Sequence, residues 1–411
     1  MTVCSSSQTR LPCAPSCFPA TRRHGLFSPA QNAVYRSTHS SQLDATTTLD
    51  VTPRRLRTFP ILRVVVPVLS ATSETIAERY SRQVLFAPIG AAGQEKIAAA
   101  RVAIVGCGAT GAAAAALLAR AGVGTLTLID RDFVEESNLQ RQVLFEEEDA
   151  RNATPKAEAA RRRIAAFNSQ IAIHAHIADL VPGNIHELLN GAQIVLDATD
   201  NFETRYLIND YSIEQAVPWI YAAAIGSYAA SMNILPGQTA CLACLFPKPP
   251  SGTVETCDTA GILNTAVNFA ASLQVTETLK YLIGDLNAMR RTLLSYDLWT
   301  NERSEISSAR PDSECEVCGK RQFVHLAGEA RPHITLCGRN SVQIHEHNRP
   351  VDFAELAARL APHGTIRSNE LLLRFERPPF TITVFPDGRA LIQGTTDPVQ
   401  ARTLYARYIG S

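Results

Sequence analysis

The chain has 411 residues, 45% of them hydrophobic, which is enough for two or three domains with substantial cores. Lysine and arginine (39) balance aspartate and glutamate (39), and no basic stripe stands out, so the sequence argues against a nucleic-acid partner. The longest apolar runs are short or carry a charge such as Arg120, so we expect no membrane-spanning segment.

Residues 1–73 differ in composition from the rest of the chain. They are rich in Ser, Thr, Pro and Arg and contain only two acidic residues, Asp44 and Asp50. Mitochondrial and plastid transit peptides share this composition. No methionine lies between Met1 and Met232, so translation from a non-Met codon near Ser70 is an equal alternative. We favour an extension without a fold, either disordered or upstream of the true start.

Residues 74–100 lead into the first strand. The pattern predicts a helical arm over residues 74–82 and a second helix over residues 93–100. Arg82 lies at the end of the arm, well before the fold proper. Composition alone makes Arg82 a solvated surface residue.

Residues 101–142 carry a nucleotide-binding pattern. A short apolar run at 102–105 predicts a buried strand, and a second run at 125–129 ends at Asp130. Between them the sequence GCGATG opens an Ala/Leu-rich helix and contributes three glycines, Gly106, Gly108 and Gly111. Such glycines permit a tight turn, and the helix N-terminus presents free N–H groups to phosphate. Asp130 is placed to accept hydrogen bonds from ribose hydroxyls.

The residues after Asp130 favour ATP over a dinucleotide. A glycine fingerprint by itself most often indicates NAD or FAD. Here a dense polar run follows the strand and includes Asp132, Asn138 and Arg141. An arginine and an asparagine turned back toward the phosphates suit a ligand with more negative charge than a pyrophosphate. ATP fits this requirement.

Two further segments predict parts of the same site. Pro155 and Lys156 open a helix that is expected to run to residue 167, and proline is well tolerated in a first helical turn. A lysine at a helix N-terminus opposes the helix dipole, so a bound anion explains Lys156 better than stability does. Strands are expected at 171–177 and 193–196, and the second ends at Asp197 and Asp200, where ligands of open α/β sheets bind. Asp197 has the alternative role of capping the next helix, residues 201–215.

The remaining core elements complete the predicted fold class. Strands are expected at 219–224 and 228–235, a long buried helix at 262–283, and a hairpin of strands at 292–299 and 303–307. The prediction is an α/β fold: a Rossmann-like, doubly wound, mostly parallel sheet extended by antiparallel strands, with a small C-terminal α+β module.

Four of the ten cysteines form two CxxC pairs that predict a structural zinc site. The two thiolates of one pair can coordinate a tetrahedral ion together, and two pairs supply all four ligands. The resulting Cys₄ site, with no open position, is formed by Cys241, Cys244, Cys315 and Cys318. Metal-binding thiols, rather than disulfides, also indicate a reducing compartment, so we expect a cytoplasmic protein.

Cys257 lies apart from these pairs, in a Pro/Gly/Thr-rich polar loop at 248–261. An exposed loop is where a reactive thiol is usable. From the chemistry alone, a reactive thiol and a bystander thiol are equal alternatives.

The last part of the chain, residues 323–411, predicts a small α+β module of unknown role. Strands are expected at 333–336, 341–345, 371–375, 380–385 and 390–392, and helices at 352–360 and 397–408. The segment lacks the active-site cysteine loop of a rhodanese.

Residues 79–320 as a set resemble the ThiF/MoeB/HesA adenylyltransferases, bacterial relatives of the ubiquitin-activating enzymes. The matching pieces follow one another in family order: RYSRQ (79–83), GCGATG, DRDFVEESNLQRQ (130–142), PKAE (155–158), DATDNFETR (197–205), CLAC (241–244), TCDTAG (256–261) and CEVC (315–318). Thr110 departs from the aliphatic residue usual there, in a helical turn that tolerates it. On this basis we divide the chain into an extension (1–73), an ATP-binding adenylyltransferase domain (74–322) and a C-terminal module (323–411).

The resemblance implies an activity and its parts. The enzyme would use ATP and Mg²⁺ to adenylate the C-terminal glycine of a ubiquitin-like sulfur carrier of the MoaD or ThiS kind, for molybdopterin, thiamine or related sulfur transfer. Asp200 would bind Mg²⁺, and Arg141 and Lys156 would stabilise the phosphates. Arg82 would reach the ATP of a homodimer partner. Sulfur would come from a persulfide donor, a cysteine desulfurase or rhodanese in trans, directly or through Cys257.

Two other functions fit the sequence less well. An inactive scaffold that docks a ubiquitin-like partner is expected to have lost Lys156, Arg141 or Asp200, and all three are present. An NAD-dependent oxidoreductase has no use for the same residues.

Overall fold

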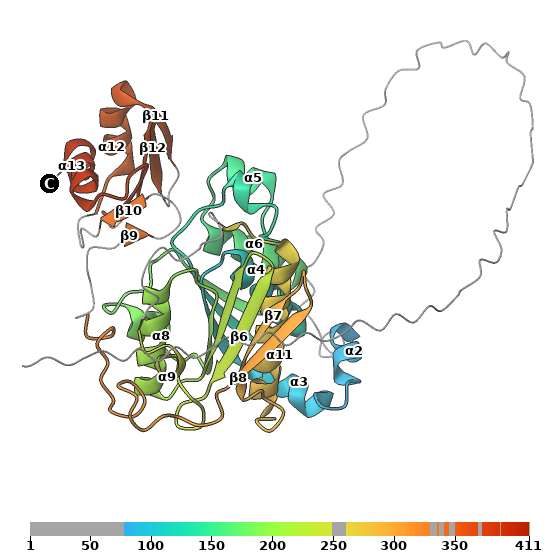
Figure 1. Ribbon diagram of the computed structural model, residues 1–411. Helices are drawn as coiled ribbons and strands as arrows, with labels where there is room; N and C mark the ends of the chain where they lie inside the picture. The colour runs from blue at the N-terminus through green and yellow to red at the C-terminus, as the bar shows by residue number, and fades with distance from the viewer. Residues whose placement is uncertain are drawn as a thin grey trace, which may run out of the picture. The chain divides into compact units, whose positions relative to one another are not determined.

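The computed structural model describes residues 78–248, 260–328, 335–336, 341–344, 350–368, 372–386 and 388–410. Figure 1 shows the chain coloured from its N-terminus to its C-terminus. The described strands form two sheets, one of eight strands and one of six. Residues 1–77 lie outside the described residues; they include the proposed extension and the first four residues of the arm. Cys257 lies outside them too, and the domain boundaries stay predictions.

The glycine-rich segment folds as the sequence predicts. Strand β1 (Arg101–Val105) and strand β2 (Thr125–Ile129) pair in parallel, and helix α4 (Ala109–Ala121) connects them. Gly122 ends α4 in the left-handed conformation, φ 84°, which glycine adopts without a Cβ clash. The first βαβ unit is therefore confirmed.

The eight-stranded sheet has the order β3-β2-β1-β4-β5-β6-β7-β8. Strands β3 (Ala172–His176), β4 (Ile194–Asp197) and β5 (Trp219–Ile225) continue the parallel part. Strands β6 (Tyr228–Ile234), β7 (Thr292–Asp297) and β8 (Glu302–Ser307) add the antiparallel extension. The predicted fold class, a mostly parallel sheet extended by antiparallel strands, is confirmed.

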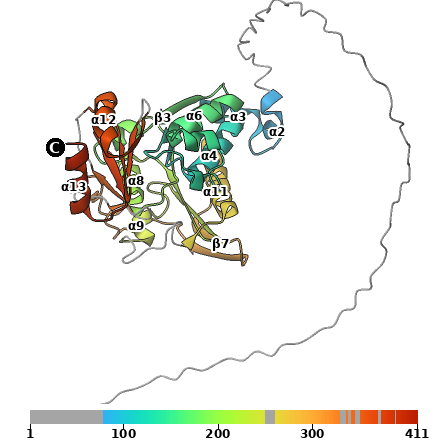
Figure 2. The same cartoon turned by 90° about the horizontal axis from the view of Figure 1, so that it is seen from above.

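Side chains alternate along the strands, so apolar side chains point to both faces of this sheet. Helices cover both faces. Val102 and Ile104 of β1 pack with the helices of one face, which are α3 (Gly90–Ala99), α4, α6 (Lys156–Phe167) and α11 (Asn264–Ile283). Ala103 and Val105 pack on the other face with α7 (Ile185–Leu188) and α8 (Phe202–Gln215). Figure 2 shows α3, α4, α6 and α11 together, with α8 apart from them.

Helix α11 differs from its prediction. We expected a helix buried on most faces, but the structure buries one face, with Ala266, Ala270 and Gln274 among its residues. The opposite face exposes Ser272 and Thr276, whose hydroxyls donate to backbone carbonyls one turn back. The helix has an amphipathic pattern that its many apolar residues conceal.

The start of α8 settles the alternative role of Asp197. The side chain of Asn201 caps α8 by accepting the N–H of Thr204 at 2.8 Å. Asp197 is wholly buried and bonds elsewhere. A capping role for Asp197 is therefore wrong.

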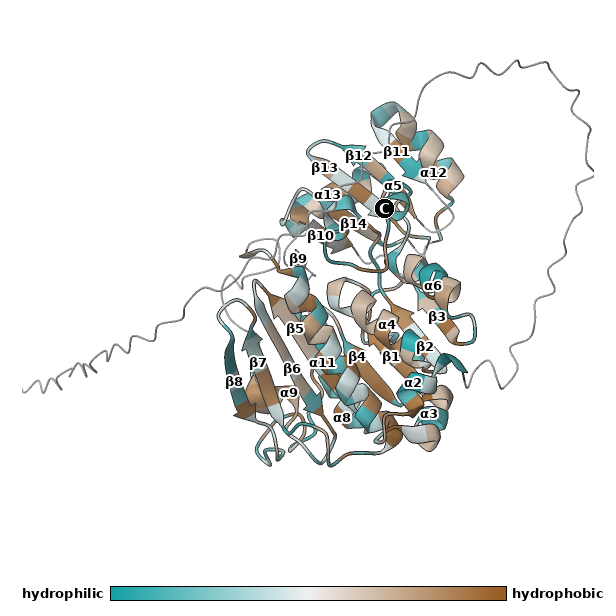
Figure 3. Ribbon diagram, turned by 90° about the vertical axis from the view of Figure 1, so that its right-hand side faces the viewer, coloured by the Kyte–Doolittle hydropathy of each residue, from teal (hydrophilic) through white to brown (hydrophobic). Residues whose placement is uncertain are grey.

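Short elements complete this part of the fold: α2 (Ser81–Val84), η1 (Glu136–Asn138), α5 (Glu147–Arg151) and α9 (Leu242–Leu245). Helix α3 begins three residues before its predicted start. Figure 3 shows β8 largely teal, in agreement with the exposure of all six of its residues. Among the described residues, no helix is long and apolar enough to cross a membrane.

The C-terminal residues form a six-stranded antiparallel sheet with the order β11-β12-β13-β14-β10-β9. Its strands are β9 (Thr335–Leu336), β10 (Ser341–Ile344), β11 (Thr365–Ser368), β12 (Leu373–Arg377), β13 (Phe380–Val384) and β14 (Ala390–Gln393). Helices α12 (Phe353–Leu360) and α13 (Pro398–Tyr408) pack against it around Leu356, Phe375 and Tyr405. The α+β module is as predicted except for β11, which the sequence did not indicate.

Candidate active site

Three glycines bring the turn after β1 against the end of β4. Gly106 has φ +91°, and a Cβ there would lie 2.7 Å from the carbonyl oxygen of Ala198. A Cβ on Gly111 would lie 1.8 Å from the carbonyl oxygen of Gly106. Only glycine permits these approaches. The glycine loop and the loop after β4 therefore form one surface at the carboxyl edge of the sheet.

The N-terminus of α4 is open to a ligand. Gly108 is its N-cap, no side chain caps the helix, and nothing lies within 4 Å of the position of a Cβ on Gly108. An uncapped helix N-terminus leaves N–H groups unbonded and attracts anions. The loop has the space and the donors that a phosphate group requires.

Asp130 fastens the glycine loop to the end of β2. Its two carboxylate oxygens accept the N–H of Cys107 at 2.6 Å and of Asp132 at 2.7 Å. Burial raises the pKa of the Asp130 carboxyl, and the charge of Lys156 opposes this rise. A carboxylate accepts about four hydrogen bonds, so capacity remains for ribose hydroxyls. Cys107 is wholly buried, as expected of a small core residue.

Lys156 and Asp132 form a partly buried ion pair beside Asp130. Lys156 is only 2% exposed, and its Nζ lies 3.1 Å from Asp132 Oδ2. The backbone N–H of Lys156 also donates to the carbonyl oxygen of Asp132, at 2.8 Å. We expected a bound anion to explain a lysine at this helix N-terminus, but Asp132 already supplies a carboxylate. A triphosphate would compete with Asp132 for the ammonium group.

Asn138 and Arg141 shape the polar turn that follows. Asn138 is 1% exposed, and its Oδ1 accepts the N–H of Glu135 at 3.2 Å in a capping box. Arg141 Nη1 donates to the carbonyl oxygen of Ser137 at 2.7 Å. Both side chains hold η1 in place, and four of the five Arg141 N–H donors are not needed for this bond. Their contacts with a nucleotide stay predictions.

Arg205 is a site residue that the sequence analysis did not single out. Its Nε lies 3.2 Å from Asp197 Oδ2, and its Nη2 donates to the carbonyl oxygen of Thr199 at 2.6 Å. Asp197 Oδ1 accepts both the N–H and the hydroxyl of Thr199, at 2.9 and 2.7 Å. These bonds fix the loop that carries Asp200. The last letter of the DATDNFETR segment was the available signal, but it does not show what the arginine contacts.

Asp200 itself is exposed at the end of this loop. Burial lowers the pKa of the neighbouring Arg131, but the charges of Asp179, Asp132 and Asp200 outweigh burial and raise it. Asp200 therefore lies within electrostatic reach of Arg131, whose Nη1 pairs with Asp179 at 2.9 Å. An exposed carboxylate at the carboxyl edge, beside other acids, has the chemistry of a Mg²⁺ ligand.

Arg82 lies at the other end of α4 from the glycine loop. Next to it, Gln83 Nε2 donates to the carbonyl oxygen of Ala121 at 2.9 Å, and Gln94 Nε2 donates to the same atom at 3.0 Å. Ala121 is the last residue of α4, which has 13 residues and is about 20 Å long. The exposed Arg82 is thus separated from the glycine loop of its own chain.

The four CxxC cysteines come together as predicted. Their sulfur atoms all lie within 4.8 Å of one another. Cys241 lies 3.7 Å from Cys244 and 3.7 Å from Cys315, and Cys244 lies 3.3 Å from Cys318. A tetrahedral ion with Zn–S bonds of about 2.3 Å sets its sulfur atoms about 3.8 Å apart. The cluster therefore fits a Cys₄ zinc ion.

Side chains of helix α8 bond the backbone in and after the two CxxC pairs. Asn209 Oδ1 accepts the N–H of Leu242 in the first CxxC pair at 2.9 Å. Asp210 Oδ2 accepts the N–H groups of His325 and Leu326, which follow the second pair, at 2.9 and 3.3 Å. The helix whose first turn contains Arg205 thus also supports both cysteine segments.

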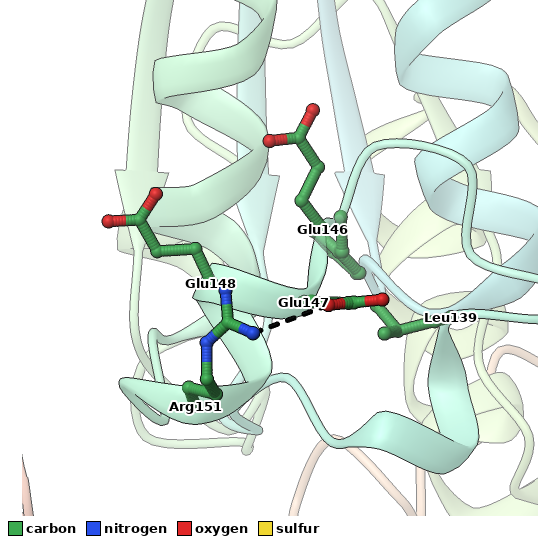
Figure 4. A pocket seen from close by; sticks show the side chains of 6 residues that line it. Leu139, Glu146, Glu147, Glu148 and Arg151 are labelled. Carbon is green, nitrogen blue, oxygen red and sulfur yellow. Dashed lines mark hydrogen bonds and ion pairs between the residues drawn. The ribbon is translucent and has the colours of Figure 1, made fainter.

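A separate cleft of about 520 Å³ lies between η1 and α5. Figure 4 shows the three carboxylates that line it, Glu146, Glu147 and Glu148, with Arg151 paired to Glu147. Three carboxylates repel a triphosphate, and neither Lys156 nor the glycine loop lines this cleft. We assign it no part in nucleotide binding.

The comparisons with known proteins agree with this geometry. The model of the ThiF family matches residues 80–317, which include the glycine loop, the Asp132–Lys156 pair and three of the four CxxC cysteines. The chain belongs to the ThiF family. This ThiF-family chain is 44% identical over 336 residues to the sulfur carrier protein ThiS adenylyltransferase of Bacillus subtilis, covering 81% of this chain and 99% of the relative.

Other relatives extend the comparison. The SAMP-activating enzyme E1 of Haloferax volcanii is 36% identical and covers 60% of this chain and 90% of its own length. Among solved structures, Escherichia coli MccB with ATP has a TM-score of 0.52 and 25% identity, over 59% of this chain and 74% of MccB. The expected ThiF/MoeB/HesA resemblance is confirmed.

Proposed function

We propose that this ThiF-family protein adenylates the C-terminal glycine of a small ubiquitin-like sulfur carrier, of the ThiS or MoaD kind. Its relatives are named as adenylyltransferases of sulfur carrier proteins. The observation that carries the proposal is the uncapped, glycine-built N-terminus of α4 beside Asp130 and the buried Lys156. This combination of donors and cation suits a nucleoside triphosphate.

The proposed reaction is the transfer of AMP from ATP to the carrier's carboxylate, and the cations of the site favour it. The carrier's carboxylate attacks the α-phosphorus of ATP, the bond to the β-phosphate oxygen breaks, and pyrophosphate leaves. Negative charge grows on the phosphate oxygens, and Lys156 and Arg141 stabilise it. The charge of Asp132 holds Lys156 in place before ATP binds. Asp130 accepts from the ribose, and Asn138 keeps the turn before Arg141 closed.

Two metal ions complete the proposal. Mg²⁺ held by Asp200 would neutralise phosphate charge, and Arg205 sets the position of Asp200 through the loop it bonds. Zinc held by Cys241, Cys244, Cys315 and Cys318 would have a structural role, because four thiolates leave no open position.

We further propose that the enzyme acts as a homodimer. Arg82 lies at the far end of α4 from its own glycine loop, so a contribution to catalysis requires the loop of a second copy. After adenylation, sulfur from a persulfide donor displaces AMP, directly or through Cys257. A cysteine desulfurase or a rhodanese acting in trans would supply the persulfide.

Carrier-dependent exchange of pyrophosphate into ATP tests this function. The protein, Mg²⁺, ATP and labelled pyrophosphate are incubated with a panel of ThiS- and MoaD-like carriers. We expect exchange with at least one carrier and none without a carrier. A carrier that binds without supporting exchange would instead favour the inactive scaffold, although the retained Lys156, Arg141 and Asp200 argue against that alternative.

A further inference from the structure

The chain segments that carry Asp132 and Lys156 are paired with each other. Phe133 and Pro155 form an antiparallel bridge, and beside it the N–H of Lys156 donates to the carbonyl oxygen of Asp132 at 2.8 Å. Successive side chains of an extended chain point to opposite sides. The ring of Phe133 therefore points away from the side on which Asp132 meets Lys156.

The C-terminal module contacts this ring. Phe133 is 1% exposed and forms a small apolar cluster with Ala153 and Leu372, which are also buried. Leu372 directly precedes β12 of the module. The guanidinium carbon of Arg374, within β12, lies 4.9 Å from the centre of the Phe133 ring. A cation over an aromatic face is attracted to it, so an apolar and a charged side chain of the module both hold this ring.

Leu372 and Arg374 lie on the face of β12 that is turned away from the helices of the module. The alternate residues, Leu373 and Phe375, pack in the core around α12 and α13. Leu372 lies outside that core and is nevertheless 1% exposed. The described residues of the module and of the ThiF-family domain belong to one compact unit of the chain. This face of β12 is therefore an internal interface with the segment that follows Asp132.

A second contact of the module lies next to Asp130. Arg389 is 7% exposed, and its Nη2 donates to the carbonyl oxygen of Ile177 at 3.4 Å. Ile177 follows His176, the last residue of β3, whose carbonyl oxygen accepts the N–H of Asp130 at 3.1 Å. The module thus contacts the segments next to both ends of the turn from Asp130 to Asp132.

We propose that the C-terminal module positions the Asp132–Lys156 pair for ATP by packing on Phe133. Leu372 and Arg374 are its positioning residues. This inference rests on the proposed function, in which Lys156 stabilises the phosphates. Phe133 follows Asp132 directly, so a displaced ring shifts the carboxylate that holds the ammonium group. Displacements of about 1 Å in a site can cost about 10²-fold in rate, so packing at this distance from the phosphates is sufficient to matter.

Equilibrium binding of a non-hydrolysable ATP analogue with Mg²⁺ tests the proposal. Leu372→Ala leaves a gap beside Phe133, and the dissociation constant should rise about 10-fold, less than the full cost of a 1 Å displacement. Leu372→Met nearly conserves the volume and should restore the constant. A partly unfolded sample has fewer binding sites but the same constant at each folded one, so this readout separates positioning from stability.

Leu356→Ala is the matched control for the cavity. Leu356 is also buried (3%), but it packs on α12 in the core of the module, on the opposite face of its sheet. Its dissociation constant should stay that of the unmodified protein. A rise equal to that of Leu372→Ala would assign the effect to the stability of the module and overturn the role of the Phe133 contact.

Arg374→Met is a second variant that leaves the apolar cluster complete. It removes the charge over the Phe133 ring, and the dissociation constant should rise about 2- to 5-fold, the scale of a cation–π contact. Glu376→Gln is its control, because it removes the carboxylate that pairs with Arg374 Nε at 2.9 Å and leaves the guanidinium group. Unchanged constants in both Leu372→Ala and Arg374→Met overturn the positioning role and leave the proposed function intact. Failure of the unmodified protein to bind the analogue would instead contradict the proposed function, and this inference with it.

Discussion

The candidate site contains a buried cation, Lys156, paired with a carboxylate. Lys156 lies almost wholly inside the protein, and a buried ammonium without a partner is costly. Asp132 supplies that partner at 3.1 Å and is itself partly exposed, so it can turn toward solvent when a phosphate approaches. The sequence placed Lys156 at the helix N-terminus correctly, but its pairing across 24 residues only became visible in the fold.

Lys156→Ala should lower carrier-dependent pyrophosphate exchange by about 10²-fold, the scale for losing one preorganised donor. ATP binding should weaken less, because the glycine loop and Asp130 remain. Steady-state exchange and equilibrium ATP binding measure the two effects. Lys96→Ala is a suitable control, since Lys96 is bonded to the carbonyl oxygen of Ile283, away from the glycine loop. Near-normal exchange by Lys156→Ala would remove Lys156 from the mechanism.

Asp210 gives the fold a pH dependence of known sign. Its side chain is wholly buried, and burial raises the pKa of the Asp210 carboxyl from 3.8 to about 6. Between these values the folded state keeps a proton that the unfolded state has lost, so stability falls as pH rises through this window. The total loss is about 3 kcal/mol and is complete about one unit above the folded-state pKa, near pH 7.

Asp210→Asn removes this titration. The stability of the variant relative to the unmodified protein should therefore increase as pH rises from about 4 to about 7. Urea unfolding of both proteins at several pH values measures the difference. Two curves that stay parallel over this range would show that Asp210 does not titrate in the folded state.

At the scale of elements, α8 links the nucleotide site to the cysteine cluster. Arg205 in its first half holds the loop of Asp200. Asn209 bonds the first CxxC pair, and Asp210 bonds His325 and Leu326, which follow the second pair. Zinc bound by the cysteines would thus stabilise α8, the helix whose Arg205 holds the Asp200 loop.

Cys241→Ala should abolish stoichiometric zinc binding and lower the melting temperature by at least about 5 °C, because metal binding at a Cys₄ site is coupled to folding. Zinc analysis and a thermal melt of the purified protein measure this. Cys107→Ala, which alters a buried cysteine outside the cluster, should retain its zinc. A zinc-free protein with an unchanged melting temperature would show that the cluster is not a structural metal site.

The elements that sequence reasoning located well are those with one dominant signal. Strand β2 is predicted to the residue because an apolar run ends at a charged turn, and α4 is bounded by glycines. The exposed face of α11 was missed, although Asn268, Ser272 and Thr276 recur every four residues and mark it. Strand β11 was missed because TIRS is short, polar and mostly exposed. Arg205 was missed because its role depends on contacts with Asp197 and Thr199 that sequence spacing does not reveal.

At the scale of the whole molecule, a homodimer would complete each active site. Arg82 and Lys156 act at one site only if they come from different copies. A site shared between two copies predicts that two inactive variants can complement each other, whereas a site within one chain does not.

Mixing the Arg82→Ala and Lys156→Ala proteins should restore activity that neither has alone. A mixed dimer has one complete site, with Lys156 from one copy and Arg82 from the other. Random exchange of subunits makes half of the dimers mixed, so exchange activity should recover to about a quarter of the unmodified level. Each variant incubated alone is the control. Subunit exchange is verified first. If activity then does not recover, Arg82 lies outside the active site of the partner.

The central claim, transfer of an adenylyl group to a carrier's C-terminus, is tested most directly by the intact mass of the carrier. After incubation with the protein, ATP and Mg²⁺, the carrier should gain the mass of one adenylyl group, and added pyrophosphate should remove it. A carrier that lacks its terminal glycine should gain nothing. A full-length carrier whose mass stays unchanged, while it demonstrably binds the protein, would contradict the account.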